Sequence, residues 1–387
     1  MVITPKTKGF ICITAHPTGC EKNILNNIEF LSKKIKLEIP GIKNVLVIGA
    51  SSGYGLASAM TASFSLGANV ICAAFEKEAQ KDRGRTATAG MYNLDAYKRE
   101  ADKNNLYLKT IIGDAFSSEI KEEICEIIKN GPKKIDMLIY SIAAPVRTDP
   151  EIGVRYSSVL KPVNKEYRSK GIDLADFKLN EISIPPATEE EIESTIKVMG
   201  GEDLELWVDI LSKNDLLSEN APVISYSYIG PPVTQDIYLN GSVGAAKKHL
   251  KETSDNLNKS YKVRSYVSIN KAVVTQSSSA IPVLPLYISI LFKVMKEKNL
   301  HENCIEQIYR LFEKLKKEKD LTDPDGFIRM DDLEMREDVQ TEVKKRWDAI
   351  ADENLLDLAD IDGYKKDFLN LFGFELDGVD YSADVEI

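Results

Sequence analysis

The chain has 387 residues, of which 43% are hydrophobic and 28% are charged, the composition of an ordinary globular protein. Its formal net charge is −10 at pH 7, and this acidic balance argues against the broad basic face of a nucleic-acid-binding protein. A local basic patch for a phosphorylated ligand is still compatible with these numbers.

The most informative stretch is KNVLVIGASSGYGLASAMTASFSLGANVICAAFE, residues 43–76. A short apolar run over 45–48 predicts a buried parallel strand. Glycines follow it, then a helix of small residues over 54–66, and then a second apolar strand over 70–75. This is a βαβ unit of the expected length.

The same alternation continues along the chain. We predict a third strand within 106–115, a helix over 117–130 and a fourth strand within 135–144. Two more strands fit 221–230 and 263–275. Strands that alternate with helices predict an α/β protein with a Rossmann-type, doubly wound parallel sheet.

A long insertion over 145–220 interrupts the alternation. It is polar, with an acidic helix predicted over 187–199, and it carries Pro150, Pro162, Pro185 and Pro186. Long insertions at strand ends usually form lids or substrate loops. We therefore expect this segment to cover the substrate.

The C-terminal part of the chain is predicted to be helical. An apolar helix fits 280–298. Charged amphipathic helices then fit 301–319, 333–350 and roughly 354–370. We predict a single enlarged dinucleotide-binding domain over 1–387, with the insertion at 145–220 and a helical extension over 300–387.

Three glycines lie directly after the first strand and directly before the first helix. A dinucleotide pyrophosphate needs a close approach of the backbone, and the amide groups at a helix start attract its negative charge. The strand–turn–helix context supports a nucleotide site, and a tight turn without a ligand is the alternative. The expected cofactor contacts are Gly49, Ala50, Ser51, Ser52, Gly53, Tyr54 and Gly55.

The ends of the following strands predict the rest of the cofactor site. Glu76 follows the second strand, where a carboxylate can accept hydrogen bonds from the ribose hydroxyls and would repel the extra phosphate of NADPH. Lys77, Arg83 and Arg85 could attract that phosphate, but Glu76 is closer to the strand end, so the sequence favours NADH. The other expected contacts are Phe75 beside Glu76, Asp114 and Ala115 near the adenine, and Ser141, Ile142 and Ala143 under the ribose.

The segment QDIYLNGSVGAAKKHL, residues 235–250, places Tyr238 and Lys247 nine positions apart. Nine steps of about 100° put two side chains on opposite faces of one helix. The pair therefore acts together only if the helix begins near Gly241 or Ser242, so that Tyr238 precedes it. A hydroxyl and an ammonium suit hydride addition to a polarised C=C–C=O group, because the hydroxyl stabilises the enolate and the ammonium holds the cofactor ribose.

The spacing alone is not specific, since Tyr156 and Lys165 have the same gap inside the insertion. Tyr238 and Lys247 are distinguished by their position, after the fifth strand and at the start of the helix beside the cofactor. The chain contains no Tyr-x-x-x-Lys pair of the ordinary short-chain dehydrogenase kind.

Six segments are informative together: GFICITAHPTGC, VIGASSGYGLASAM, YSIAAPVRTDP, ISYSYIGPPVTQDIYLNGSVGAAKKHL, SINKAVVTQSSSAIPVLPLY and DGFIRMDDLEM. With them, nearly the whole chain resembles the long, mostly monomeric trans-2-enoyl-CoA reductases and their sister enoyl-acyl-carrier-protein reductases. The resemblance implies a monomer that uses NADH to reduce enoyl-CoA or enoyl-acyl-carrier-protein. It also implies that Tyr238 and Lys247 are catalytic and that Tyr228 contacts the substrate. Val273, Val274 and Thr275 would meet the nicotinamide carboxamide.

Several alternatives stay open at this point. Leu284 and Phe292, on the apolar helix, are either core residues or the lining of an acyl pocket. A ketone or alcohol dehydrogenase of the short-chain type is one alternative function. A non-catalytic NADH-sensing protein is another, and such a protein would have no need of Tyr238.

Two segments imitate metal sites, and we expect no metal at either. His16 and Cys20 would need further ligands, but the chain has only three histidines. LTDPDGFIRMDD, residues 321–332, resembles an EF-hand loop, yet Leu321 occupies the first ligand position and Asp332 stands where the bidentate Glu belongs. We predict a turn there.

The cysteines and the N-terminus predict a cytoplasmic protein with no membrane segment. The first twenty residues lack the apolar core of a signal peptide, and no run approaches the roughly 20 apolar residues of a membrane span. The cysteines are odd in number and scattered, as is typical of reduced thiols: Cys12, Cys20, Cys72, Cys125 and Cys304.

Overall fold

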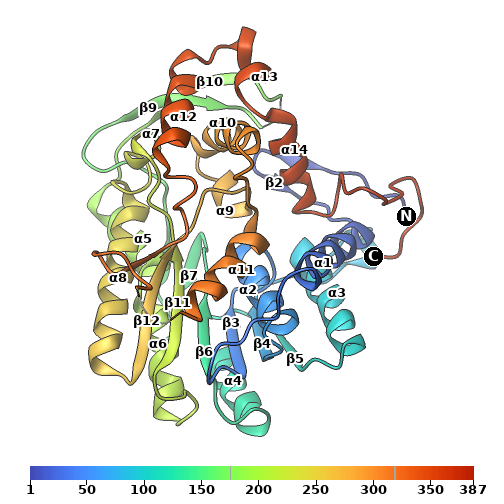
Figure 1. Ribbon diagram of the computed structural model, residues 1–387, viewed down its shortest axis with the longest axis vertical. Helices are drawn as coiled ribbons and strands as arrows, with labels where there is room; N and C mark the ends of the chain where they lie inside the picture. Colours follow the sequence, from blue (N-terminus) through green and yellow to red (C-terminus); the bar gives the residue numbers. More distant parts are fainter. Residues whose placement is uncertain (175, 318–319) are drawn as a thin grey trace.

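The computed structural model describes residues 1–174, 176–317 and 320–387, and its centre is a seven-stranded parallel sheet (Figure 1). The strands lie in the order β13-β12-β11-β6-β3-β4-β5. Their bounds are β3 Asn44–Ile48, β4 Asn69–Ala74, β5 Leu108–Ile112, β6 Met137–Tyr140, β11 Ala221–Ser227, β12 Val263–Ile269 and β13 Phe327–Arg329. The predicted α/β class and parallel sheet are confirmed.

Helices cover both faces of the sheet because each strand sends alternate side chains to opposite sides. Along β3, Val45 and Val47 pack in one apolar cluster, whereas Leu46 and Ile48 pack in another. The first cluster includes α1 (Pro17–Ser32), α2 (Gly53–Phe64), α3 (Ala89–Lys103) and α11 (Cys304–Leu315). The second includes α4 (Ser118–Asn130), α6 (Glu202–Lys213) and α8 (Ser242–Ser260).

The order of the strands indicates where a ligand would bind. From β3 the chain builds β4 and β5 on one side, and it then crosses to β6, β11 and β12 on the other. In such sheets ligands bind outside the carboxyl ends of the strands at this switch point, here between β3 and β6. Ile48 and Tyr140 are paired at the ends of these two strands. Gly49 and Ser141 therefore leave the sheet side by side.

The six predicted strands are confirmed, and the seventh, β13, is absent from the sequence prediction. The segment that imitates an EF-hand begins with the predicted turn, in which Asp323 Oδ1 accepts from the N–H groups of Asp325 and Phe327 at 3.0 and 2.9 Å. The chain then continues as β13 and pairs with β12. A strand of three residues in which only Ile328 is fully buried is too short to give a periodic signal.

The insertion contains more regular structure than the one predicted helix. Two antiparallel hairpins, β7–β8 and β9–β10, precede α5 (Glu189–Met199) and α6. The hairpin strands are Val146–Thr148, Arg155–Ser157, Tyr167–Ile172 and Leu179–Ile184. Residue 175 of this segment lies outside the described residues. Leu204 and Trp207 of α6 are buried against the sheet, so α6 belongs to a helical layer of the sheet. That the earlier part covers the substrate stays a prediction.

The C-terminal helices pack around α10 (Leu284–Glu297), which is the predicted apolar helix. With it, α12 (Glu337–Ala349) and α14 (Ile361–Asn370) form a third apolar cluster, in the upper part of Figure 1. The helix predicted over 354–370 is interrupted after α13 (Leu355–Leu358), where Asp360 caps α14 by accepting from the Gly363 N–H at 3.0 Å. Residues 318 and 319 of the predicted helix 301–319 lie outside the described residues.

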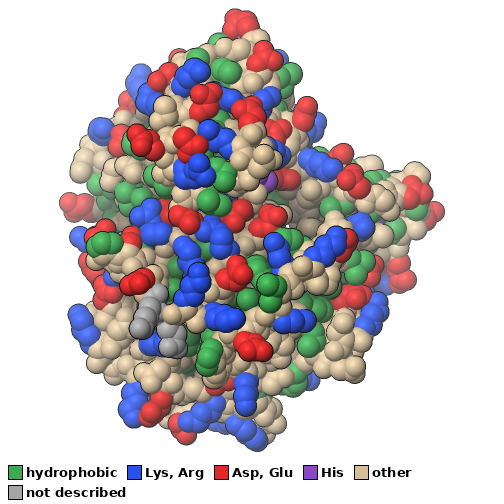
Figure 2. All heavy atoms as spheres, viewed as in Figure 1, with side chains coloured by type: hydrophobic (Ala, Val, Ile, Leu, Met, Phe, Trp, Pro, Cys, Tyr) green, Lys and Arg blue, Asp and Glu red, His purple; other side chains and the backbone are tan. Residues whose placement is uncertain are grey.

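Two surface properties follow from the described residues. None of their helices is both long enough and apolar enough to cross a bilayer. On the face shown in Figure 2, acidic and basic side chains are interspersed, and neither sign gathers into one broad patch.

Candidate active site

The turn after β3 has the bare backbone that a pyrophosphate needs. Gly49 has a φ of +85° and Gly53 a φ of +52°, in the left-handed region that favours glycine. A Cβ on Gly49 would lie 2.3 Å from the Ser141 carbonyl oxygen, and a Cβ on Gly55 would lie 1.9 Å from the Gly49 carbonyl oxygen. Side chains are therefore excluded at Gly49 and Gly55, and the turn leads directly into the N-terminus of α2.

The other residues predicted in this turn have individual roles. Ser51 is nearly buried, and its carbonyl oxygen accepts a hydrogen bond from the Asn93 side chain at 3.1 Å. Ser52 is the N-cap of α2, and its side chain makes no capping hydrogen bond. Tyr54 donates its hydroxyl to the Lys271 carbonyl oxygen at 2.7 Å. Tyr54 thus joins the turn to the loop after β12, and its hydroxyl is not available to the cofactor.

Glu76 follows β4 and lies against the start of α3. A Cβ on Gly90 would lie 2.1 Å from Glu76 Oε1 and 2.7 Å from the Ser51 Cβ. The absence of a side chain at Gly90 thus allows the Glu76 carboxylate to lie beside the glycine turn. The neighbouring Phe75 is 73% exposed at the same sheet edge, so its ring is open to a flat partner such as adenine.

The carboxyl ends of β5 and β6 lie at the same edge of the sheet, with β3 and β4 between the two strands. One carboxylate oxygen of Asp114 accepts from the Phe116 N–H at 3.0 Å, and the other has no hydrogen-bond partner among the described residues. Ala115 is buried, and its carbonyl oxygen accepts from Lys121 Nζ at 2.9 Å. Ser141 and the following Ile142 face the glycine turn, because a Cβ on Gly49 would approach their backbone.

Tyr238 precedes α8, as the spacing requires. Gly241 is the N-cap of α8, and a Cβ on it would lie 2.4 Å from the Ile237 carbonyl oxygen. Tyr238 lies in the turn after α7 (Pro232–Gln235), where its N–H donates to the Thr234 carbonyl oxygen at 3.1 Å. Its side chain is 9% exposed, and its hydroxyl has no hydrogen-bond partner among the described residues. Burial raises the pKa of this phenol, so it remains a proton donor at neutral pH.

Lys247 lies in the second turn of α8 and is anchored at the end of β11. Its Nζ donates to the Tyr226 carbonyl oxygen at 3.1 Å, and an ammonium has two further N–H groups for a ligand. Burial lowers the pKa of Lys247 to about 8. Most Lys247 side chains are therefore protonated at neutral pH, and they lose this charge as the pH rises through about 8.

Tyr228 lies beside Tyr238 but is bonded differently. The two rings meet edge to face with centroids 5.3 Å apart. The Tyr228 hydroxyl donates to Glu334 Oε1 at 3.1 Å. Glu334 is fully buried and comes from the C-terminal extension. The sequence prediction does not include Glu334, because an acid in the stretch DDLEM is typical of a solvated surface and carries no signal of burial.

The segment after β12 lies beside the glycine turn. Val273 and Val274 are buried. Thr275 caps the short helix α9 (Gln276–Ser279) in a capping box with Ser278, and its methyl group would lie 3.6 Å from a Cβ on Gly53. These contacts bring the predicted nicotinamide segment to the predicted pyrophosphate turn.

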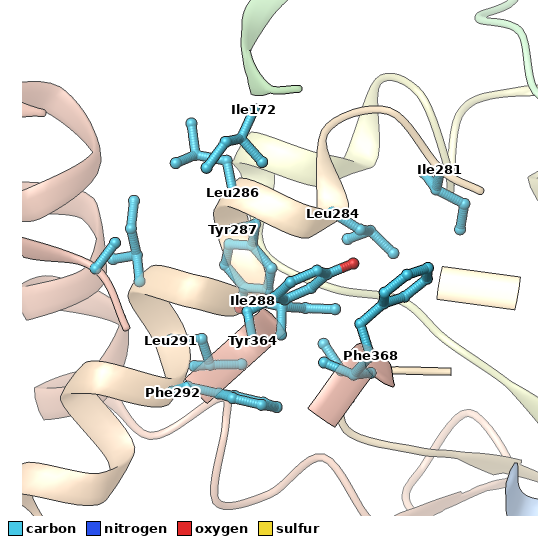
Figure 3. Packing of buried hydrophobic residues seen from close by; sticks show 14 of the residues in the cluster. Ile172, Ile281, Leu284, Leu286, Tyr287, Ile288, Leu291, Phe292, Tyr364 and Phe368 are labelled. Atoms are coloured by element: carbon cyan, nitrogen blue, oxygen red, sulfur yellow. The ribbon is translucent and has the colours of Figure 1, made fainter. Parts of the chain in front are cut away.

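Leu284 and Phe292 are both buried in the third apolar cluster. Figure 3 shows Leu284 on the first turn of α10, near Ile281 and Tyr364, and Phe292 two turns further along the helix. The Phe292 ring packs against His301 at 4.3 Å between centroids. Both residues contribute to the core, and a role in an acyl pocket stays a prediction.

The two residues of the HPTGC motif that imitate metal ligands have structural partners. His16 Nδ1 accepts from the Gly19 N–H at 3.2 Å and so caps α1. The Cys20 thiol lies against Gly373, where a Cβ would approach it to 2.9 Å. Among the described residues, no group of three or more His, Cys, Asp or Glu side chains is arranged to hold a metal ion.

Three family models match the chain in succession. "NAD(P)H binding domain of trans-2-enoyl-CoA reductase" matches residues 2–81. "Trans-2-enoyl-CoA reductase catalytic region" matches residues 85–315. "Enoyl reductase FAD binding domain" matches residues 322–385. The first two contain the glycine turn and the Tyr238–Lys247 pair, respectively.

The third description names FAD, whereas the first names NAD(P)H, and FAD enters here only through that description. The buried polar groups of this segment are already bonded within the protein: Glu334 to Tyr228, and the Tyr364 hydroxyl to the Ser279 hydroxyl at 3.0 Å. A depression in its surface is bordered mainly by charged side chains. Apart from Thr341, the depression is lined by charged residues: Glu297, Lys298, Arg336, Glu337, Asp338, Glu342 and Arg346.

The relatives match over their full length. The trans-2-enoyl-CoA reductase (NADH) of Ruminiclostridium cellulolyticum is 49% identical, covering 100% of this chain and 98% of its own. The enoyl-acyl-carrier-protein reductase (NADH) of Flavobacterium johnsoniae is 51% identical, covering 99% and 97%.

Solved structures match the fold equally closely. The Treponema denticola trans-2-enoyl-CoA reductase in complex with NAD is 45% identical with a TM-score of 0.94, covering 100% of this chain and 98% of its own. The Clostridium acetobutulicum enzyme in complex with NADH is 44% identical with a TM-score of 0.95 and the same coverage. The chain therefore belongs to the trans-2-enoyl-CoA reductase family.

Proposed function

We propose that the protein reduces the C2=C3 double bond of trans-2-enoyl thioesters with NADH. The observation that carries this proposal is the Tyr238 hydroxyl, which is buried and has no protein partner among the described residues. A hydroxyl held in this way is ready to donate to a substrate oxygen. Crotonyl-CoA, which would become butyryl-CoA, is the simplest substrate of this class.

The predicted cofactor residues fit NADH. The left-handed glycines Gly49 and Gly53 support a pyrophosphate site, and the position of Glu76 beside this turn supports its role as an acceptor for the adenosine ribose. Lys247 can donate to the nicotinamide ribose with the N–H groups that Tyr226 leaves unused. When bound, NADH supplies the hydride that adds to C3 of the enoyl group.

The protein stabilises the charge that this addition creates. As C3 gains the hydride, negative charge develops on the thioester oxygen, and Tyr238 donates its hydroxyl to that oxygen. A donor that is already oriented needs no rearrangement in the transition state, which is the source of its catalytic effect. A proton then goes to C2, from Tyr238 or through a water molecule, and the saturated thioester leaves.

The carrier, assembly and location form the finer part of the proposal. The relatives' names include both coenzyme A and acyl carrier protein as carriers, and we propose enoyl-CoA as a substrate, with acyl carrier protein as the alternative. We further propose a monomer, covered by the insertion and the C-terminal helices. The protein is proposed to work in the cytoplasm, in keeping with its five free cysteines, with no nucleic-acid or membrane partner.

The test is NADH consumption, followed at 340 nm, with crotonyl-CoA and with crotonyl-acyl-carrier-protein. Turnover on either thioester is expected. Cofactor binding without turnover on any short enoyl thioester would favour an NADH sensor. Oxidation of simple alcohols without enoyl reduction would instead establish a short-chain-type dehydrogenase. The rate ratio for one acyl chain on the two carriers identifies the preferred carrier.

A further inference from the structure

Glu334 accepts three hydrogen bonds from three separate parts of the chain. Its Oε1 accepts from the Tyr287 hydroxyl at 2.6 Å and from the Tyr228 hydroxyl at 3.1 Å. Its Oε2 accepts from the Ala272 N–H at 2.7 Å. The residue is 0% exposed. A carboxylate is costly to bury unless it is well bonded, so this arrangement is a built network and not an accidental contact.

The network is held in place from outside the site. Gln340 of α12 donates to the Tyr287 hydroxyl at 3.2 Å and to the Glu334 carbonyl oxygen at 2.7 Å. Lys271 is a buried cation whose charge acts on Glu334, and its Nζ donates to the Ala272 carbonyl oxygen at 3.0 Å. The carboxylate is therefore fixed by α10, by α12 and by the loop after β12.

One of the three donors belongs to the proposed site, and another directly adjoins it. Tyr228 is the predicted substrate residue, and its ring lies edge to face against Tyr238. Ala272 directly precedes the segment Val273–Thr275, which is predicted to meet the nicotinamide. One carboxylate thus links the predicted substrate residue to the backbone that leads into the predicted nicotinamide segment, and neither hydrogen bond could be predicted from the sequence.

The direction of the bond limits what Tyr228 can do. A phenol has one proton, and Tyr228 donates it to Glu334. With its proton on Glu334, Tyr228 has only lone pairs left for another partner and cannot donate to a thioester oxygen. Tyr238, whose hydroxyl is unpartnered among the described residues, remains the donor.

We propose that Glu334 is a positioning residue for the reduction, which holds Tyr228 in place and fixes its hydroxyl as a non-donor toward the substrate. The inference rests on the proposed enoyl reductase function and deepens it. Glu334 acts through Tyr228 and touches neither substrate nor cofactor. Its second bond, to Ala272, holds the backbone that leads into the nicotinamide segment.

The test is a double-mutant cycle in the full-length enzyme with Glu334→Gln and Tyr228→Phe. Glutamine keeps the shape and can still accept from the Ala272 N–H, but its amide group then faces the two tyrosine hydroxyls. We expect Glu334→Gln to lower kcat/KM for crotonyl-CoA about tenfold, in keeping with the loss of a hydrogen bond to a charged group. The Kd of NADH, measured by fluorescence titration, should change less than about twofold.

The interaction between the two changes separates positioning from general destabilisation. In the Tyr228→Phe background, Glu334→Gln should lower kcat/KM less than about twofold, because the Tyr228 hydroxyl through which Glu334 acts is already absent. A matched control is Asp203→Asn, which alters another buried carboxylate that accepts from a tyrosine, Tyr140, at 2.9 Å. The factors by which Asp203→Asn and Tyr228→Phe each lower kcat/KM should multiply in the double variant, as expected for independent sites.

A tenfold loss that persists in the Tyr228→Phe background would overturn the positioning role, as would a Glu334→Gln enzyme with unchanged kcat/KM. A wild-type enzyme that fails to turn over either crotonyl thioester would instead overturn the proposed function, and with it the role of Glu334 in that function.

Discussion

The sharpest prediction concerns Tyr238→Phe, which removes one hydroxyl and leaves the ring. Two tyrosines lie with ring centroids 5.3 Å apart, but only the Tyr228 hydroxyl is bonded to a protein group among the described residues. Replacing Tyr238 therefore breaks no internal hydrogen bond, whereas replacing Tyr228 removes one bond to a buried carboxylate. The two variants should differ in both activity and stability.

The magnitudes follow from those bonds. Loss of one oxyanion donor typically costs about 10²–10³ in turnover, or about 2.7–4 kcal/mol. The kcat of Tyr238→Phe should fall by this factor. Its NADH binding should change little, and its Tm should shift by less than about 2 °C. Tyr228→Phe loses a hydrogen bond worth about 1–3 kcal/mol, so its Tm should fall by several degrees while its kcat falls less.

The assays are steady-state kinetics with crotonyl-CoA, NADH fluorescence titration and thermal unfolding of the three proteins under one condition. A Tyr238→Phe enzyme with near-normal turnover, beside an inactive Tyr228→Phe enzyme, would refute the assignment. The two tyrosines would then have to exchange roles, and the direction of the Tyr228–Glu334 bond would have to reverse during the reaction.

Four further predictions follow from the site. Lys247→Ala should weaken NADH binding as well as turnover, because we propose that the ammonium contacts the ribose before chemistry; unchanged NADH affinity would contradict this. The Kd of NADH should rise by up to about tenfold between pH 7 and 9, because Lys247, with a pKa of about 8, loses its charge in that range. Lys247→Arg, which stays charged, should abolish this rise; a rise that persists would assign the titration to Lys271, whose pKa burial also lowers to about 8. Glu76→Gln should narrow the preference for NADH over NADPH, measured as a ratio of kcat/KM, and a wild-type enzyme that prefers NADPH would show that Arg83 and Arg85 outweigh Glu76. Light scattering should give a mass near the 43.2 kDa of one chain at all concentrations, and a constant mass of twice that value would exclude the monomer.

Much of the sheet could be predicted because its signals are local. A buried strand such as β3 is a continuous apolar run, and its glycine turn follows within the same dozen residues. The start of α8 was equally accessible, since the spacing of Tyr238 and Lys247 on one helix would separate them. The structure confirms that start at Gly241 and Ser242.

The elements that escape prediction depend on distant partners. β13 is a strand only because β12 offers it an edge, and three residues cannot show a period. The hairpins of the insertion are similar, because they pair short polar segments with each other and not with the sheet. α6 is an exception, because its buried Leu204, Trp207 and Leu211 have the spacing of one helix face and could have been recognised in the sequence.

The site shows the same division between local and distant signals. Tyr228 and Tyr238 are chemically identical, and their spacing in the sequence does not say which one can donate a proton to a substrate. The difference comes from Glu334, which is 106 residues beyond Tyr228 in the chain. A buried carboxylate takes the only proton of one phenol and leaves that of the other available. The chemistry of the pair is therefore a property of the C-terminal extension as much as of the segment that carries the tyrosines.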